Sequence, residues 1–319
     1  MVKNKNTLLL YVIIIINLLF SAGCIREDIP ECEQPEPERV PIRLKTAIVS
    51  RAAMDEFSET LVCIAQSTAT GEYGEVWDAT ASGSEIRFSP ERYYPADSSL
   101  IYLSGYYPAA PLTNGRVEFK LDGQTDVMAA KVQAGSLTSP FDKMAETFSF
   151  RHLLSLLKFS VQLEKQCPET YYLKHLSLDG STETAWLDLS DNRLQFDTKQ
   201  KKLIVYEAEH SAGIEISAQK TFSGYLLVRP RADLAVDIIL AKDDNPEHDL
   251  SYADLPVEFE GDGSEANVAY KIDIIIGSPD LPFDPDNPPP PQITLSIRAQ
   301  VTGWNEVPGE DIDLTPSNK

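Results

Sequence analysis

The stretch LKFSVQLE, residues 157–164, decides the fold class of this chain. Its apolar side chains stand at alternate positions, Leu157, Phe159, Val161 and Leu163, and the positions between them are polar. Successive side chains of a β-strand point to opposite faces of the sheet, so strict alternation indicates a strand with one buried face and one solvated face.

The same alternation recurs along most of the chain. It is found in segments 40–49, 116–123, 213–218, 224–230, 236–242, 270–276 and 292–301. Helix signals are few, and residues 141–156 are the segment that could hold a short helix. Many short strands separated by turn residues favour an all-β protein of antiparallel β-sandwiches over alternating β-α-β units.

Length, charge and cysteine content limit the function classes. The chain has 319 residues, enough for two domains of ordinary size. Its formal net charge of −21 repels phosphate backbones, so we expect no nucleic-acid partner. There are four cysteines, Cys24, Cys32, Cys63 and Cys167, without a CxxC pair. The sequence leaves the disulfide state of the last three open.

The N-terminal segment, residues 1–23, has the pattern of a secretion signal. Lys3 and Lys5 precede an apolar core of about 13 residues, which is short against the roughly 20 that a transmembrane helix needs. The core ends in Ser21-Ala22-Gly23 followed by Cys24, and it resembles the signal of a bacterial lipoprotein. That resemblance implies removal of residues 1–23 and acylation of Cys24, for example by palmitate.

Changes of composition predict the further organisation. Residues 24–39 are acidic and proline-rich, and they predict an extended tether. Residues 40–51 then hold a first strand. A break in the strand pattern near 165–169 predicts a boundary between an N-terminal sandwich at 52–166 and a C-terminal sandwich at 167–319 that includes the terminal strand.

Catalytic and metal-binding motifs are missing from the sequence. It has no nucleophile elbow, phosphate loop or HExxH, and its four histidines are scattered. His152 lies in the apolar segment FSFRHLL, where a packed, hydrogen-bonded histidine is the commoner case. The acidic residues around His248 offer too few regularly spaced oxygens for calcium. We therefore expect a protein that is not an enzyme and uses no metal or other cofactor.

Several segments together resemble the fimbrillin family, the subunits and accessory proteins of the type V pili of anaerobic Gram-negative bacteria. They are the lipoprotein cysteine, IVSRAA at 48–53, Phe57 to Leu61, YYPADSSLIYLSGYYPAA at 93–110, FSFRHLLSLLKFSVQL at 148–163 and QVTGWNEVPGEDIDL at 300–314. Their order and spacing carry the likeness, which covers essentially the whole chain.

The resemblance implies two transthyretin-like, Greek-key antiparallel β-sandwich domains in tandem. It also implies lipid-linked delivery to the cell outer membrane, exposure at the surface and a cut after an arginine by an Arg-specific protease, with the mature form in the fimbrium. Arg51, followed by Ala52, matches that cleavage site. Arg39 fits less well because it lies in the tether, and Arg43 because it lies within a strand.

Removal of the first strand would create a site for polymerisation. The empty groove would have two unpaired strand edges, which a strand of a neighbouring subunit could fill. A head-to-tail contact of this kind propagates as a fibre. The candidate groove and donor residues are Val40, Ile42, Leu44, Ile293, Leu295, Ile297, Val301, Ile312 and Leu314. The donor is either segment 293–301 or segment 311–314.

The sequence allows other functions beside that of a stalk or tip subunit. The chain could remain a lipid-anchored surface protein that binds glycans or proteins, or an uncleaved pilus anchor. Its expected partners are other pilus subunits, the outer membrane before cleavage, the protease and a host or bacterial surface ligand. The tyrosines that could form a sugar-stacking platform, or else lie in the core, are Tyr93, Tyr94, Tyr102, Tyr106 and Tyr107.

Overall fold

The structure is a computed structural model that describes residues 39–49, 54–55, 57–69, 71–164, 170–209, 213–217, 221–243, 245–259, 261–277 and 294–304. All of these residues belong to one unit, Arg39–Lys319. Its regular structure is almost entirely strand, so the prediction of an all-β protein is confirmed. The described part has no helix that is long and apolar enough to cross a lipid bilayer.

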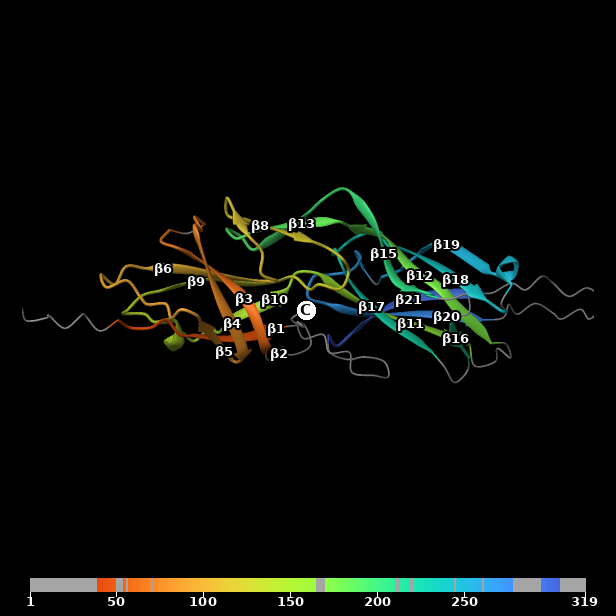
Figure 1. Cartoon of the computed structure of the whole chain (residues 1–319), viewed down its shortest axis with the longest axis horizontal. Helices are drawn as coiled ribbons and strands as arrows, with labels where there is room; N and C mark the ends of the chain where they lie inside the picture. Colours follow the sequence, from red (N-terminus) through yellow and green to blue (C-terminus); the bar gives the residue numbers. More distant parts are fainter. Residues whose placement is uncertain are drawn as a thin grey trace, which may run out of the picture. The chain divides into compact units, whose positions relative to one another are not determined.

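The N-terminal strands form one sheet that closes on itself (Figure 1). The strand order is β10-β9-β6-β3-β4-β5-β1, and β1 pairs back to β10. A short strand, β2, is attached to β1. The members are β1 (Leu44–Val49), β2 (Met54–Asp55), β3 (Phe57–Ser67), β4 (Glu75–Gly83), β5 (Glu85–Phe88), β6 (Ile101–Tyr107), β9 (Met128–Gly135) and β10 (Phe148–His152).

This closed sheet differs from the N-terminal antiparallel sandwich that the sequence predicts. The closing pair, β1 with β10, is parallel, and it turns the sheet into a barrel-like ring around one core. Large side chains from several strands fill that core, among them Phe57, Phe148 and Phe150. The short helix predicted over residues 141–156 is wrong beyond a single turn of 3-10 helix, η1 (Phe141–Lys143). Residues 148–152 instead alternate between the core and the outside, as strand β10.

Two further sheets share a second core in the C-terminal half. One has the order β17-β11-β20-β21 and the other β15-β12-β18-β19, with β16 paired to β12. Their members are β11 (Ser155–Leu163), β12 (Tyr171–Thr182), β15 (Gln200–Glu207), β16 (Ile214–Ile216), β17 (Phe222–Val228), β18 (Ala235–Ala241), β19 (Leu250–Pro256), β20 (Ala269–Gly277) and β21 (Thr294–Thr302). A 3-10 turn, η2 (Pro246–His248), precedes β19.

A small fourth sheet has the order β14-β13-β8-β7. Its members are β7 (Leu112–Thr113), β8 (Arg116–Lys120), β13 (Thr184–Asp188) and β14 (Arg193–Phe196). Its inner side chains, including Phe119 and Leu187, belong to a third core.

Strand pairings cross the predicted domain boundary. Residues 165–169, where the sequence predicts that boundary, lie outside the described residues. β11 precedes them but pairs with β17 and β20, which follow them. Likewise β8, from the first half of the chain, pairs with β13 from the second. Strands from both sides of the predicted boundary therefore lie in the same sheets, and the small sheet is one of these.

Candidate functional site

Strand β1 is the element that closes the barrel, and it has hydrogen-bonded neighbours on both sides. On one side Thr46 to Val49 pair in parallel with Phe148 to Arg151 of β10. On the other side Leu44 and Lys45 pair with β5, and Ile48 and Val49 pair with β2. Within the sheet β1 is therefore a central strand, and without it β5 and β10 would both become edges.

Additional polar contacts hold the segment around β1. The Thr46 hydroxyl donates a buried hydrogen bond of 2.8 Å to the carbonyl of Phe148. The Thr46 amide donates to the Ser84 carbonyl at 2.9 Å, and the Ile42 amide donates to the Arg92 carbonyl at 2.7 Å. These contacts tie the segment to β10 and to residues that flank β5.

Apolar side chains of the segment reach into the barrel core. Ile42, Leu44 and Ile48 are 3–5% exposed and belong to that core. Thr46 is also buried, and Ala47, on the opposite face of the strand, is 8% exposed. Val40 lies before the strand and is 44% exposed. The groove beneath β1 is thus occupied mainly by three large aliphatic side chains.

The groove floor is aromatic. The rings of Phe57 and Phe150 meet edge to face with centroids 5.3 Å apart, and Phe148 meets Phe150 in the same way at 5.8 Å. Gly105 of β6 gives these rings room, because a β-carbon there would lie 2.7 Å from both Phe148 and Phe150. An apolar floor between two strand edges is what a strand from another chain needs in order to bind.

The comparisons with known proteins agree with this architecture. A family model described as fimbrillin-like matches residues 51–304. The chain belongs to the fimbrillin-like family. The match begins two positions after the last residue of β1, Val49, and ends at Trp304.

Solved structures share the fold of this fimbrillin-like chain. A "putative cell adhesion protein" from Bacteroides uniformis has a TM-score of 0.55 at 16% identity, over 85% of this chain and 100% of that one. Another so described, from Parabacteroides distasonis, has a TM-score of 0.55 at 9% identity, over 86% and 98%. A fimbrial protein from Bacteroides vulgatus has a TM-score of 0.52 at 10% identity, over 82% and 99%. No curated protein sequence matches the chain.

Several predicted sites of the fimbrillin-like chain lie outside the described residues. They are the acylation site Cys24, the cleavage site Arg51 and Ala52, and the donor candidates Ile293, Ile312 and Leu314. The register of β1 and β2 nevertheless pairs Val49 with Met54, so four chain positions, 50–53, connect the two strands.

The terminal strand β21 is an edge strand of a C-terminal sheet. It pairs antiparallel with β20 along its whole length, from Thr294 with Gly277 to Thr302 with Ala269. Ile297 packs against the C-terminal core, and Ala299 belongs to it, whereas Val301 is 63% exposed. β20 lies between β11 and β21 in this sheet. Donation of segment 293–301 would require β21 to leave β20, and the edge of β20 that faces away from β11 would then be unpaired.

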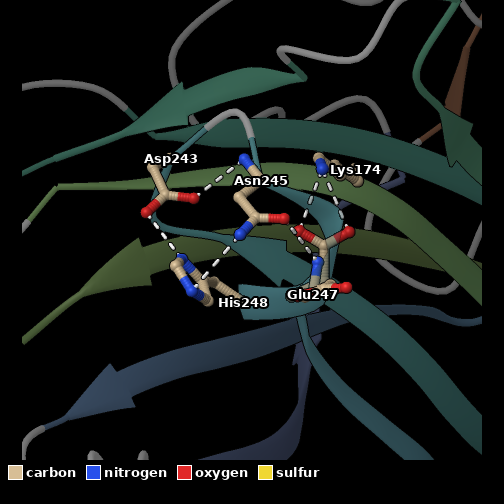
Figure 2. Close-up of polar contacts among 6 residues, drawn as sticks. Lys174, Asp243, Asn245, Glu247 and His248 are labelled. Atoms are coloured by element: carbon tan, nitrogen blue, oxygen red, sulfur yellow. Dashed lines mark hydrogen bonds and ion pairs between the residues drawn. The ribbon is translucent and has the colours of Figure 1, made fainter.

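The acidic loop at residues 243–249 makes its contacts mainly within itself (Figure 2). The Asp243 carboxylate contacts the His248 ring nitrogen Nδ1 at 2.9 Å and accepts from the backbone N–H of Asn245 at 2.9 Å. The bond with His248 is the main reason why the pKa of Asp243 lies below its ordinary value. Lys174 contacts both carboxylate oxygens of Asp249, at 2.9 and 3.0 Å. The carboxylates of Asp243 and Asp249 therefore already have nitrogen partners.

The tyrosines of the predicted sugar platform do not share one environment. Tyr94 and Tyr106 are buried, and Tyr106 donates its hydroxyl to the Ala110 carbonyl at 2.8 Å. Burial raises the pKa of both phenols. Tyr93 is 38% exposed. A different aromatic residue, Trp186, is not among the predicted site residues. The alternating stretch TAWLD nevertheless marks it as outward-facing.

Proposed function

We propose that this fimbrillin-like chain is a structural subunit, in the stalk or at the tip, of a type V pilus that supports adhesion. The precursor is delivered to the outer membrane as a lipoprotein through Cys24. An Arg-specific protease cuts between Arg51 and Ala52, the segment 40–51 leaves, and a strand of the next subunit takes its place. The observation that carries this proposal is the position of β1 between β5 and β10, over an apolar core.

Apolar burial would contribute to the stability of such a joint. Burial of a large aliphatic side chain stabilises by about 1.5–3 kcal/mol, so replacing Ile42, Leu44 and Ile48 is worth roughly 5–9 kcal/mol before ordering costs. The bonds along β5 and β10 add register and specificity. The family match begins at residue 51, so it leaves out residues 40–50 of the segment that is proposed to be removed.

We propose segment 311–314 as the donor in preference to 293–301. Ile312 and Leu314 keep the apolar alternation of a donor strand, and donating them leaves the pairing of β21 with β20 in place. Donation of 293–301 would expose the edge of β20 and remove Ala299 from its core. We also propose the transthyretin-like description for the C-terminal half, where two sheets share one core.

N-terminal sequencing of the surface-exposed protein tests the cut. Ala52 as the first residue supports the filament function. A blocked, acylated Cys24 supports instead an uncleaved anchor or a lipid-anchored binding protein. The buried, doubly paired β1 is compatible with these alternatives, because the uncleaved chain is a complete fold.

Assembly is tested with trypsin-treated precursor on a non-boiled gel. The wild-type chain should form a ladder, the Arg51→Ala chain should stay monomeric, and Arg43→Ala, which changes an exposed arginine of the same segment, should still form the ladder. Equal laddering by the Arg51→Ala chain contradicts the mechanism. Deletion of residues 305–319 should abolish the ladder if 311–314 is the donor, and should leave it intact if 293–301 is.

A further inference from the structure

The outer face of the small sheet carries an unusual group of side chains. Strands β8 and β13 turn Val117, Phe119, Ala185 and Leu187 into the third core. Alternation therefore turns the residues between them outward. In the register of the two strands Trp186 lies opposite Glu118, and Asp188 lies opposite Arg116. A half-buried tryptophan is thus placed among charged groups on a solvated sheet face.

This face is hollowed into an open cavity of about 790 Å³, within the range of roughly 300–1,000 Å³ that is usual for ligand sites. Its lining includes Trp186, Glu118, Asp188, Arg116, Asn114 and Ser190. Asn114 comes from the two-residue turn between β7 and β8, where Asn114 and Gly115 have φ of +52° and +74°. Asn-Gly suits such a turn, because both positions need a positive φ.

Hydrogen bonds hold the polar groups of the cavity in place. The indole Nε1 of Trp186 donates to Glu118 Oε2 at 3.2 Å. Arg116 Nε contacts Asp188 Oδ2 at 3.3 Å, and the Ser190 hydroxyl donates to Asp188 Oδ1 at 2.6 Å. That Ser190 bond is the main cause that lowers the pKa of Asp188, so its carboxylate is ionised at neutral pH. The Nε1–H bond lies in the ring plane, so it does not use the faces of the indole.

From this arrangement we propose that the cavity over β8 and β13 binds a neutral pyranose unit of a surface glycan. A pyranose has an apolar C–H face that packs on an aromatic ring, and its rim carries hydroxyls. The carboxylates of Glu118 and Asp188 would accept from those hydroxyls, and the Asn114 amide and Arg116 guanidinium would donate to them. A few fixed polar groups around one apolar platform are the usual composition of a specific site.

Two other ligand classes fit the cavity less well. The charged lining groups are one cation, Arg116, against two anions, Glu118 and Asp188, in a chain of net charge −21. This balance disfavours an acidic sugar. A quaternary ammonium group is held by several aromatic rings that enclose it. Trp186 is the one aromatic residue that lines this described cavity, and the cavity is open.

The inference names a ligand for the adhesive role in the proposed function, but it does not rest on strand exchange. Measurements on the uncleaved Arg51→Ala chain therefore separate the two. If that chain binds glycan but wild-type precursor fails to polymerise, only the assembly proposal is lost. If the wild-type precursor polymerises after cleavage but neither the wild-type chain nor the Arg51→Ala chain binds glycan, only this inference is lost.

The test is titration of the full chain with cellotetraose, xylotetraose, mannotetraose and lacto-N-tetraose, followed by calorimetry and tryptophan fluorescence. 3′-Sialyllactose and choline chloride serve as the acidic and quaternary probes. We expect saturable binding of at least one neutral tetrasaccharide and a loss of at least about tenfold in affinity in Trp186→Ala, with a milder loss in Trp186→Phe. Tyr93→Ala, which removes an exposed ring outside the cavity, should bind as wild type does.

The inference is overturned if no neutral tetrasaccharide binds, if Trp186→Ala binds as tightly as wild type, or if only sialyllactose or choline saturates. Thermal melting shows whether Trp186→Ala is folded. If it is not, Asn114→Gly decides instead, because glycine keeps the positive φ of the turn and removes the amide. That variant should weaken binding at least threefold, and unchanged affinity overturns the inference.

Discussion

The imidazole ring of His152 stacks on the indole ring of Trp304, with the ring centroids 3.7 Å and the planes 17° apart. Both residues are 5% exposed. The edge of the same imidazole ring makes a polar contact, because His152 Nδ1 meets Asp126 Oδ2 at 2.5 Å. His152 ends strand β10 of the barrel and Trp304 follows β21 of a C-terminal sheet, so the stack joins the barrel to the end of the described chain.

We expect Trp304→Ala to lower the free energy of unfolding by about 3–5 kcal/mol, because it empties a buried aromatic site and uncovers His152. Urea denaturation of the Arg51→Ala chain measures this loss without interference from cleavage. Trp186→Ala is the matched control, since its ring is only half-buried, and it should cost about 1 kcal/mol or less. Equal losses in the two variants would show that Trp304 does not carry the contact.

Ile48 of β1 should matter for the precursor but not for the filament. Ile48→Ala removes a buried side chain from the barrel core and should destabilise the uncleaved chain by about 2–4 kcal/mol. After the cut the residue leaves with its segment, so the dissociation temperature of the ladder should not change. Val40→Ala, at an exposed position, should change neither quantity. A ladder that is weakened by Ile48→Ala would mean that β1 stays in the assembled subunit.

The sequence predicts the strands and their buried faces well, because alternation is a local signal. Leu157, Phe159, Val161 and Leu163 of β11 are buried as predicted. The solvated face predicted for the same strand is wrong, because Lys158 and Ser160 are buried as well. The Lys158 ammonium donates to the Gly303 carbonyl at 2.7 Å, a contact across 145 positions. The local sequence pattern does not predict that Gly303 is the partner of Lys158.

Strand partners are the part that could not be predicted. Alternation in β1 and in β10 is equally compatible with edge or central positions, and the parallel closure joins residues about a hundred positions apart. In the same way the period of two marks Trp186 as outward-facing. Only the pairing of β13 with β8 brings it to Glu118 and Arg116. The candidate ligand cavity therefore depends on long-range register that a single sequence does not carry.

A glycine is required at position 180 of β12, because the backbone of Asp233 lies close to it. Its φ is +92°, and a β-carbon at this position would lie 2.0 Å from the carbonyl oxygen of Asp233. Gly180→Ala should therefore lower the free energy of unfolding by at least about 2 kcal/mol, through both strain and collision. Gly74→Ala is the control, because open space surrounds that position, and it should stay within about 0.5 kcal/mol of wild type. Chemical denaturation distinguishes the two, and a neutral Gly180→Ala would contradict the register of β12 against residue 233.

The carboxylate of Asp188 should make stability depend on pH in the acid range. Its pKa in the folded chain lies below the ordinary value of 3.8, chiefly because the Ser190 hydroxyl donates to it. The unfolded chain therefore binds this proton more readily. The stabilisation is complete above that ordinary value, and it is lost as the pH falls through the folded pKa.

We expect Asp188→Asn to be less stable than wild type at pH 7, by about 1 kcal/mol or less, and we expect this stability gap to narrow toward pH 2. Thermal melting at pH 7, 5 and 2 measures the gap. A constant gap for Asp188→Asn across the series would mean that its effect comes from packing rather than from charge.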